Sequence, residues 1–69
     1  MNGITVVICA YNEEKNIIPV ILETITVLKA TTDDYEIILV DDGSLDKTQE
    51  VIKTLAQQNN FIKYVIPSI

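Results

Sequence analysis

The feature that most constrains the fold of this chain is an alternation: short apolar runs are separated by a segment whose apolar residues recur at helical spacing. Residues 4–10 form a continuous apolar run rich in β-branched side chains, and residues 37–40 form a second one within the predicted strand 35–40. Such runs are typical of strands covered on both faces, as in parallel sheets. Between them, apolar side chains recur at helical spacing: Ile17, Ile18, Ile21, Leu22, Ile25 and Leu28. We therefore predict two buried strands joined by a helix with one apolar face.

The same alternation continues after the second strand. Asp46 and Gln49 resemble a capping box at the start of a second helix, which we expect to end near residues 58–60. The apolar face of this helix would consist of Val51, Ile52, Leu55 and Ala56. Residues 61–66 predict a third, shorter strand. The order of elements indicates an α/β fold, a βαβαβ Rossmann-like parallel sheet with right-handed crossovers.

Length, charge and cysteine content narrow the class of protein. We assign residues 1–69 to a single domain and expect it to be incomplete, because a core of this size sustains a fold only marginally. The net charge of −5 argues against binding nucleic acid through its phosphates. Cys9 is the single cysteine, so a disulfide framework is excluded. We expect a cytoplasmic chain with no membrane segment, and with no room for a signal peptide before Ile4.

Polar side chains follow each of the first two predicted strands. Residues 11–13 read Tyr-Asn-Glu, and residues 41–44 read Asp-Asp-Gly-Ser. Parallel strands end at the same edge of a sheet, and neighbouring strands lie only about 4.8 Å apart. Open α/β sheets bind ligands at this carboxyl edge. The two segments should therefore meet where a ligand is expected.

The residue types in these segments suit a nucleotide. Tyr11 offers a ring face for stacking on a base, and the carboxylates of Glu13 and Asp42 can accept hydrogen bonds from ribose hydroxyls or a base N–H. Gly43 permits close approach of the backbone or a turn with positive φ. The free N–H groups at the start of the second helix could help to hold an anion.

Each of these residues also has a purely structural interpretation. Asp-Gly-Ser is common turn chemistry, so Asp42 or Ser44 could simply cap the second helix. Tyr11 could be a half-buried packing residue. Glu13 and Glu14 could do no more than favour the N-terminus of the first helix. The pairing of the two segments, each directly after a strand, favours the ligand site.

Two segments resemble a known family when they are taken together. The first reads ITVVICAYNEEKNI, and the second reads YEIILVDDGSLDKTQEVI. Both are similar to the opening of the family 2 glycosyltransferases, which have the GT-A fold. In that family one strand leads into Tyr-Asn-Glu and the next into Asp-Asp-Gly-Ser-x-Asp-x-Thr. The resemblance covers nearly the whole chain and implies the N-terminal, nucleotide-binding portion of a truncated GT-A domain.

The resemblance also implies roles for particular residues. Four of them would line the pocket for the nucleotide base: Cys9, Ala10, Tyr11 and Glu13. Tyr11 would lie against the base. Asp42 would accept hydrogen bonds from the base or ribose of a nucleotide-sugar donor, either a UDP-sugar or a GDP-sugar. Asp41 would make a weaker contact or hold the turn.

Other parts of the family machinery are not expected in these residues. The complete enzyme would use Mg²⁺ or Mn²⁺ held by an Asp-x-Asp motif on a following strand. Asp41 and Asp42 do not form that motif, because they are adjacent rather than alternating. We therefore expect no metal ligand and no catalytic residue here, and no sugar transfer by the chain alone. The second segment is particularly similar to the subgroup that loads sugars onto polyprenyl phosphate, which implies a complete enzyme associated with a membrane.

Two other classes of function are also compatible with parts of the sequence. A non-catalytic module could bury its uncovered sheet edges and apolar helix faces by self-association, which would make it a homo-oligomer. A phosphoacceptor domain of the response-regulator type also carries acidic pairs at strand ends. There the pair follows the first strand, whereas here the first strand is followed by residues 11–13, so this class is disfavoured.

Overall fold

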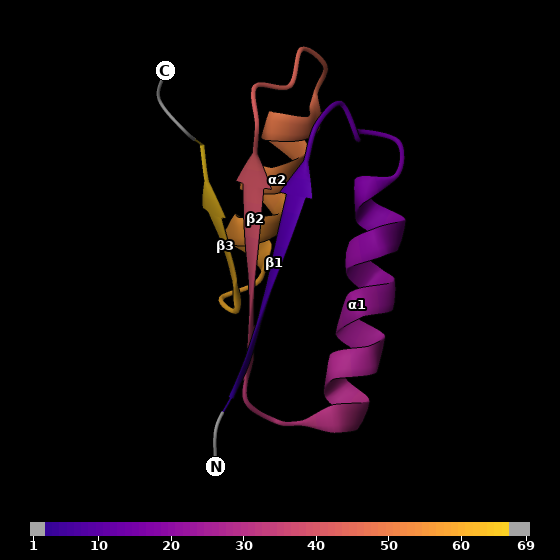
Figure 1. The fold of residues 1–69 in the computed structure, drawn as a ribbon, viewed down its shortest axis with the longest axis vertical. Coiled ribbons are helices and arrows are strands. Elements are labelled where there is room, and N and C mark those ends of the chain that lie inside the picture. The colour runs from indigo at the N-terminus through magenta and orange to yellow at the C-terminus, as the bar shows by residue number, and fades with distance from the viewer. Residues whose placement is uncertain (1–2, 67–69) are drawn as a thin grey trace.

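Five elements of secondary structure follow one another in the predicted order. The computed structural model describes residues 3–66, so both ends of the assigned 1–69 domain lie outside the described residues. The elements are β1 (Ile4–Ala10), α1 (Ile17–Thr31), β2 (Tyr35–Asp41), α2 (Thr48–Gln58) and β3 (Ile62–Val65). The βαβαβ order is therefore confirmed (Figure 1).

The three strands form one parallel sheet, as the sequence predicts. Its order is β1-β2-β3, with β2 in the centre. The register of β1 and β2 runs from Ile4 opposite Tyr35 to Ala10 opposite Asp41. The last residues of these two strands are therefore direct neighbours, and the loops that follow them leave the sheet from the same edge.

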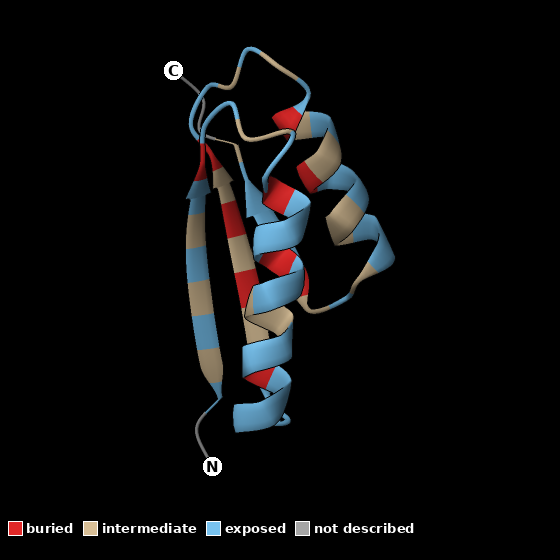
Figure 2. Ribbon diagram, turned by 90° about the vertical axis from the view of Figure 1, so that its right-hand side faces the viewer, coloured by how far each residue is buried: buried red, intermediate tan, exposed pale blue. Residues whose placement is uncertain are grey.

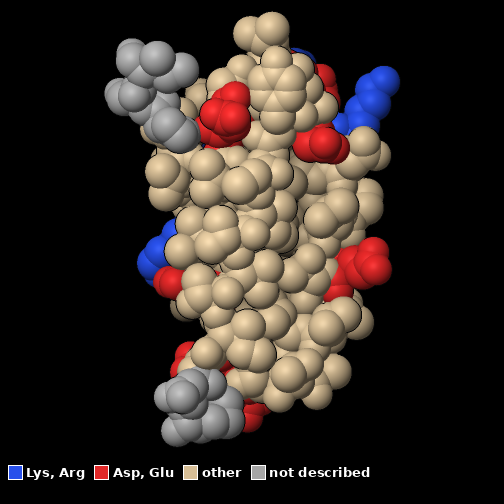
Figure 3. Space-filling view, in the orientation of Figure 1, with Lys and Arg blue, Asp and Glu red and all other residues tan. Residues whose placement is uncertain are grey.

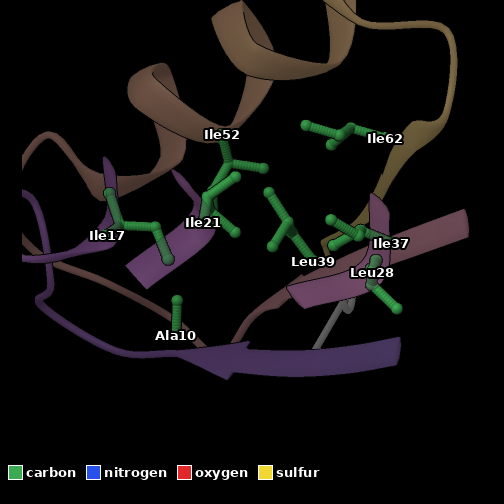
Figure 4. Close-up of a cluster of buried hydrophobic side chains, with 8 residues drawn as sticks. All are labelled: Ala10, Ile17, Ile21, Leu28, Ile37, Leu39, Ile52 and Ile62. Atoms are coloured by element: carbon green, nitrogen blue, oxygen red, sulfur yellow. The ribbon is translucent and has the colours of Figure 1, made fainter. Parts of the chain in front are cut away.

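Both helices pack on one face of the sheet, which gives a fold of two layers (Figure 2). The core lies between the layers and draws on every element (Figure 4). Its buried apolar residues are Ala10, Ile17, Ile21, Leu28, Ile37, Leu39, Ile52 and Ile62. Because successive side chains of a strand point to opposite faces, alternate residues of β1 and β2 supply this core.

The outer face of the sheet differs from the prediction. Val7 is 58% exposed and Val65 is 50% exposed, and Cys9 is exposed beside them. Figure 3 shows this face as a broad uncharged surface with charged side chains mostly near its margins. Within residues 3–66, the prediction that the strands are covered on both faces is therefore wrong. A continuous apolar run indicates that both faces are apolar, but it does not show what covers the second one.

The buried face of α1 is narrower than the sequence predicts. Ile17, Ile21 and Leu28 of α1 are buried, whereas Ile18 and Leu22 of the predicted apolar face are 44% and 59% exposed. Adjacent positions on a helix lie about 100° apart, so a single sheet face buries only one of the two stripes. Neither helix in the described part of the chain is both long and apolar enough to span a membrane.

The start of α2 corrects a further expectation. The helix begins at Thr48, and the Asp46 carboxylate accepts a hydrogen bond from the Thr48 N–H at 2.9 Å. The Gln49 amide reaches toward Asp41 instead of completing a capping box with Asp46. The predicted capping box is therefore wrong, although Asp46 does satisfy a free N–H at the helix start.

Candidate functional site

The two loops after β1 and β2 meet at the carboxyl edge of the sheet, as predicted. The Asp42 N–H donates to the Ala10 carbonyl at 3.2 Å, which extends the strand pairing into the loops. Beyond this point, residues 12–14 and 44–48 are joined by hydrogen bonds between groups more than thirty residues apart in sequence. The site is therefore a pair of loops fixed against each other, and not two independent turns.

One set of bonds runs through the Ser44 hydroxyl. It accepts from the Asn12 N–H at 3.0 Å and donates to a carboxylate oxygen of Asp41. In the opposite direction, the Leu45 N–H donates to the Asn12 side-chain carbonyl at 2.8 Å. The first loop is thus tied to the second through both the backbone and the side chain of Asn12.

A second set runs through the Thr48 hydroxyl. It accepts from the Glu13 N–H at 2.7 Å and donates to a carboxylate oxygen of Asp46. The other oxygen of Asp46 lies 3.4 Å from the Glu14 N–H, a long contact. Both hydroxyls therefore follow one pattern: each accepts from a backbone N–H of the first loop and donates to an aspartate near the second.

Two residues in the left-handed region of backbone space give the loops their shape. Asn12 has φ 53° and Gly43 has φ 81°. Asparagine tolerates this region better than most residues, and glycine carries no Cβ penalty there. The positive φ predicted as one option for Gly43 is thus observed.

The two adjacent aspartates differ in burial. Asp41 is fully buried, and its carboxylate accepts from the Ser44 hydroxyl and lies 3.4 Å from the Gln49 amide nitrogen. Asp42 is exposed, and its carboxylate accepts no hydrogen bond from any of residues 3–66. Asp41 is the last residue of β2 and packs into the fold, whereas Asp42 begins the loop that follows the strand. The geometry favours the turn-holding role for Asp41 and leaves Asp42 available to a ligand.

The residues expected to line the base pocket are distributed unevenly. Tyr11 is 55% exposed. Cys9 and Glu13 line one small cavity of about 190 Å³, together with Ile8, Ile17 and Val20. Ala10 is buried in the core, so it meets the site only through its backbone. That any of these residues contacts a nucleotide stays a prediction.

Two predictions about charged ligands, one for an anion at α2 and one for a metal ion, can be compared with the structure. The Thr48 N–H, expected to be free for an anion, is already bonded to the Asp46 carboxylate, which would repel a second anion. Among residues 3–66, no three His, Cys, Asp or Glu side chains are grouped so that they could hold a metal ion. The described residues therefore do not fit the Mg²⁺ or Mn²⁺ that the resemblance implies.

The hydrogen bonds between the loops change the pKa of Asp46. The hydrogen bond from the Thr48 hydroxyl, with smaller contributions from backbone N–H groups, holds the pKa of Asp46 below its ordinary value of 3.8 despite partial desolvation. A hydrogen bond to the charged form favours that form. Asp46 is therefore ionised, and the second set of bonds intact, at neutral pH.

This lowered pKa predicts how the loops respond to acid. A carboxylate with a depressed folded pKa adds stability above its unfolded pKa, and that stability is lost as the pH falls through the folded value. We expect the amide signals of Glu14 and Thr48 to shift together in an acid NMR titration, with a midpoint below 3.8. The Asp46→Asn variant should lack this transition, and a midpoint at or above 3.8 would contradict the assignment.

Sequence reasoning did not find the roles of Asn12 and Thr48. The available signal was the spacing Ser-x-Asp-x-Thr after the paired aspartates, which places two hydroxyls and one carboxylate on one short loop and helix start. Its partners, the N–H groups of Asn12 and Glu13, are 32 and 35 residues away. Such pairs become visible only when the strand register is known.

Comparison with known proteins adds an independent line of information. The sequence profile of the family described as "Glycosyl transferase family 2" matches residues 5–68. An undecaprenyl-phosphate 4-deoxy-4-formamido-L-arabinose transferase of Photorhabdus laumondii is 48% identical over 56 residues, covering 80% of this chain and 17% of the relative. The protein of that name from Proteus mirabilis is 35% identical over 68 residues, covering 96% of this chain and 21% of the relative.

A third relative has a different name. A dolichyl-phosphate beta-glucosyltransferase of Trichomonas vaginalis is 38% identical over 60 residues, covering 80% of this chain and 19% of the relative. The chain thus spans about a fifth of the length of the curated relatives it matches.

Proposed function

This chain belongs to glycosyl transferase family 2, and on that premise we propose that it supplies the base- and ribose-binding part of a nucleotide-sugar site. One observation carries the proposal: two loops are fixed side by side at the carboxyl edge, and Asp42 and Tyr11 are left exposed there. Open α/β sheets bind ligands at this edge.

Each exposed group has a distinct part in donor binding. Asp42 accepts hydrogen bonds from ribose hydroxyls or from a base N–H of UDP or GDP, and Tyr11 stacks on the base. Cys9 and Glu13 line the cavity beside β1 and bound the base pocket. Asp41 does not touch the ligand directly, because its carboxylate is buried.

In the whole protein the reaction is transfer of a sugar from a nucleoside diphosphate to an acceptor. An acceptor oxygen attacks the anomeric carbon, and the bond to the diphosphate breaks with its electron pair leaving on the diphosphate oxygen. The names of the relatives support polyprenyl phosphate as acceptor, since they specify undecaprenyl phosphate and dolichyl phosphate. Such an acceptor would bring the whole protein to a membrane surface. The 69-residue chain alone is expected to transfer no sugar.

Calorimetric titration of the chain with UDP, GDP and ADP tests the donor site. We expect weak binding of UDP or of GDP, and weaker binding of ADP, because base contacts near Tyr11 and Asp42 distinguish the nucleotides. A parallel assay with the sugar nucleotide and polyprenyl phosphate should yield no product. Equal affinity for all three nucleotides would contradict a base-specific pocket, and binding of none would contradict donor binding by this chain.

The exposed outer face of the sheet favours a second candidate, a self-associating module. Val7, Val65 and Cys9 lie on this face, and a second copy of the chain could cover them. Sedimentation over a concentration series separates the two functions. A concentration-dependent dimer that binds no nucleotide would support the module, whereas a monomer that binds nucleotide would exclude it.

A further inference from the structure

We propose that Thr48, backed by Asp46, is a positioning residue that holds the loop around Glu13 in the shape that receives the nucleotide. The inference rests on the proposed function, because it concerns the same site. In this proposal Thr48 does not contact the nucleotide itself. It acts through the Glu13 backbone, which its hydroxyl binds at 2.7 Å.

The first step of the argument is the burial of Thr48. Its side chain is fully buried, although threonine is a polar residue at the first position of α2. Burying a hydroxyl is unfavourable unless it is hydrogen-bonded. The Thr48 hydroxyl accepts from the Glu13 N–H and donates to Asp46, so both of its functions are used within the protein. It is therefore placed for a contact between loops and not for a ligand.

The second step concerns the two segments that this hydrogen bond connects. Residues 13 and 48 are 35 positions apart, and the bond joins the loop after β1 to the start of α2. Glu13 then accepts hydrogen bonds at its carbonyl from Asn16 and Ile17, at 2.9 and 2.8 Å, as α1 begins. Thr48 thus fixes the point where the first loop turns into α1, two residues after Tyr11.

The third step is energetic. Ordering a loop on binding reduces affinity, and a loop already held in its bound shape avoids that cost. The Thr48 hydroxyl, which accepts from the Glu13 N–H, itself donates to the charged Asp46 carboxylate. Hydrogen bonds to a charged group are stronger than neutral ones, so Asp46 holds the Thr48 hydroxyl in place. Removing the Thr48 hydroxyl should therefore release the loop and weaken nucleotide binding without removing any ligand contact.

The test compares three variants by nucleotide titration and by amide hydrogen exchange. Thr48→Val keeps the branched shape and loses the hydroxyl, whereas Thr48→Ser keeps the hydroxyl. Thr54→Val is the matched control on the same helix, because the Thr54 hydroxyl bonds only to the Glu50 carbonyl among the described residues. We expect Thr48→Val to weaken UDP or GDP binding by about 5- to 30-fold. Thr48→Ser and Thr54→Val should bind nearly as the natural chain does.

Hydrogen exchange distinguishes release of this one loop from a general loss of stability. In Thr48→Val the Glu13 amide should exchange faster, while the Asn12 amide, held by Ser44, keeps its protection. Equal acceleration of all amides would indicate general destabilisation and would overturn the inference. So would nucleotide binding by Thr48→Val at the affinity of the natural chain.

Two further outcomes are also decisive. If the natural chain binds neither nucleotide, the proposed function fails for this chain, and the exchange of the Glu13 amide alone decides whether Thr48 holds the loop. If Thr48→Val does not fold, Asp46→Asn carries the test, because it leaves Thr48 and the core in place. Asp46→Asn should accelerate exchange at Glu13 and Glu14 and weaken binding, and unchanged exchange at both would overturn the inference.

Discussion

Replacing Asp42 by asparagine should weaken binding of the preferred nucleotide, UDP or GDP, by about 10- to 100-fold, since a hydrogen bond to a charged group contributes roughly 1.5–3 kcal/mol. The carboxylate is exposed at the carboxyl edge and accepts no hydrogen bond within residues 3–66, so its acceptor capacity is free for the ligand. Asparagine keeps the size of the side chain and removes its charge. Calorimetric titration of both proteins measures the change.

The control for this prediction is Asp33→Asn. Asp33 is also exposed, and it lies in the connection between α1 and β2, at the opposite edge of the sheet. Both variants change the net charge equally, so a purely long-range charge effect would alter the two affinities alike. Asp42→Asn should leave the unfolding temperature within the small range typical of surface substitutions. Equal affinities of Asp42→Asn and the natural chain would exclude Asp42 from the site.

Replacing Asp41 by asparagine should instead destabilise the fold, by about 1–3 kcal/mol, because a buried donor loses its acceptor. The two carboxylate oxygens of Asp41 face the Ser44 hydroxyl and the Gln49 amide, and asparagine has only one oxygen to offer. In a domain of this size, each kcal/mol lowers the unfolding temperature by roughly 4–8 °C. Thermal unfolding followed by circular dichroism measures the shift.

Asp42→Asn is the matched control for this second prediction, since it makes the same chemical change one residue away. Asp41→Asn should lower the unfolding temperature clearly, and Asp42→Asn should not. If the two variants unfold at the same temperature, the division of the pair into a structural and a ligand-facing carboxylate is wrong. The comparison needs no nucleotide, so it stands independently of the binding prediction.

The order and extent of the elements could be predicted because periodicity is a local property of the sequence. The apolar run at residues 4–10 and the stripe that includes Ile17, Ile21 and Leu28 match β1 and α1 closely. The environment of each face could not be predicted in the same way. Val7 and Leu22 are apolar but exposed, because their exposure depends on which elements lie against them and not on the pattern itself.

The approach of the two loops was predictable, but the hydrogen bonds between them were not. Parallel strands must end at one edge, so residues 11–13 and 41–44 had to approach each other. The bonds from Asn12 and Glu13 to two hydroxyls depend on positive φ at Asn12 and on the register between strands. The sequence also left the two roles of Asp41 open, and burial of its carboxylate favours the structural one.

The most direct test of donor binding at this edge is a proton–nitrogen NMR titration of the chain with UDP and then with GDP. We predict that one nucleotide shifts the amide signals of Tyr11, Glu13 and Asp42, while signals of β3 and the far end of α1 stay in place. Such a pattern would locate the nucleotide between the two loops and identify the preferred base. A well-folded sample that shows no shifts, or shifts confined to the outer face around Val7 and Val65, would contradict nucleotide binding at this site.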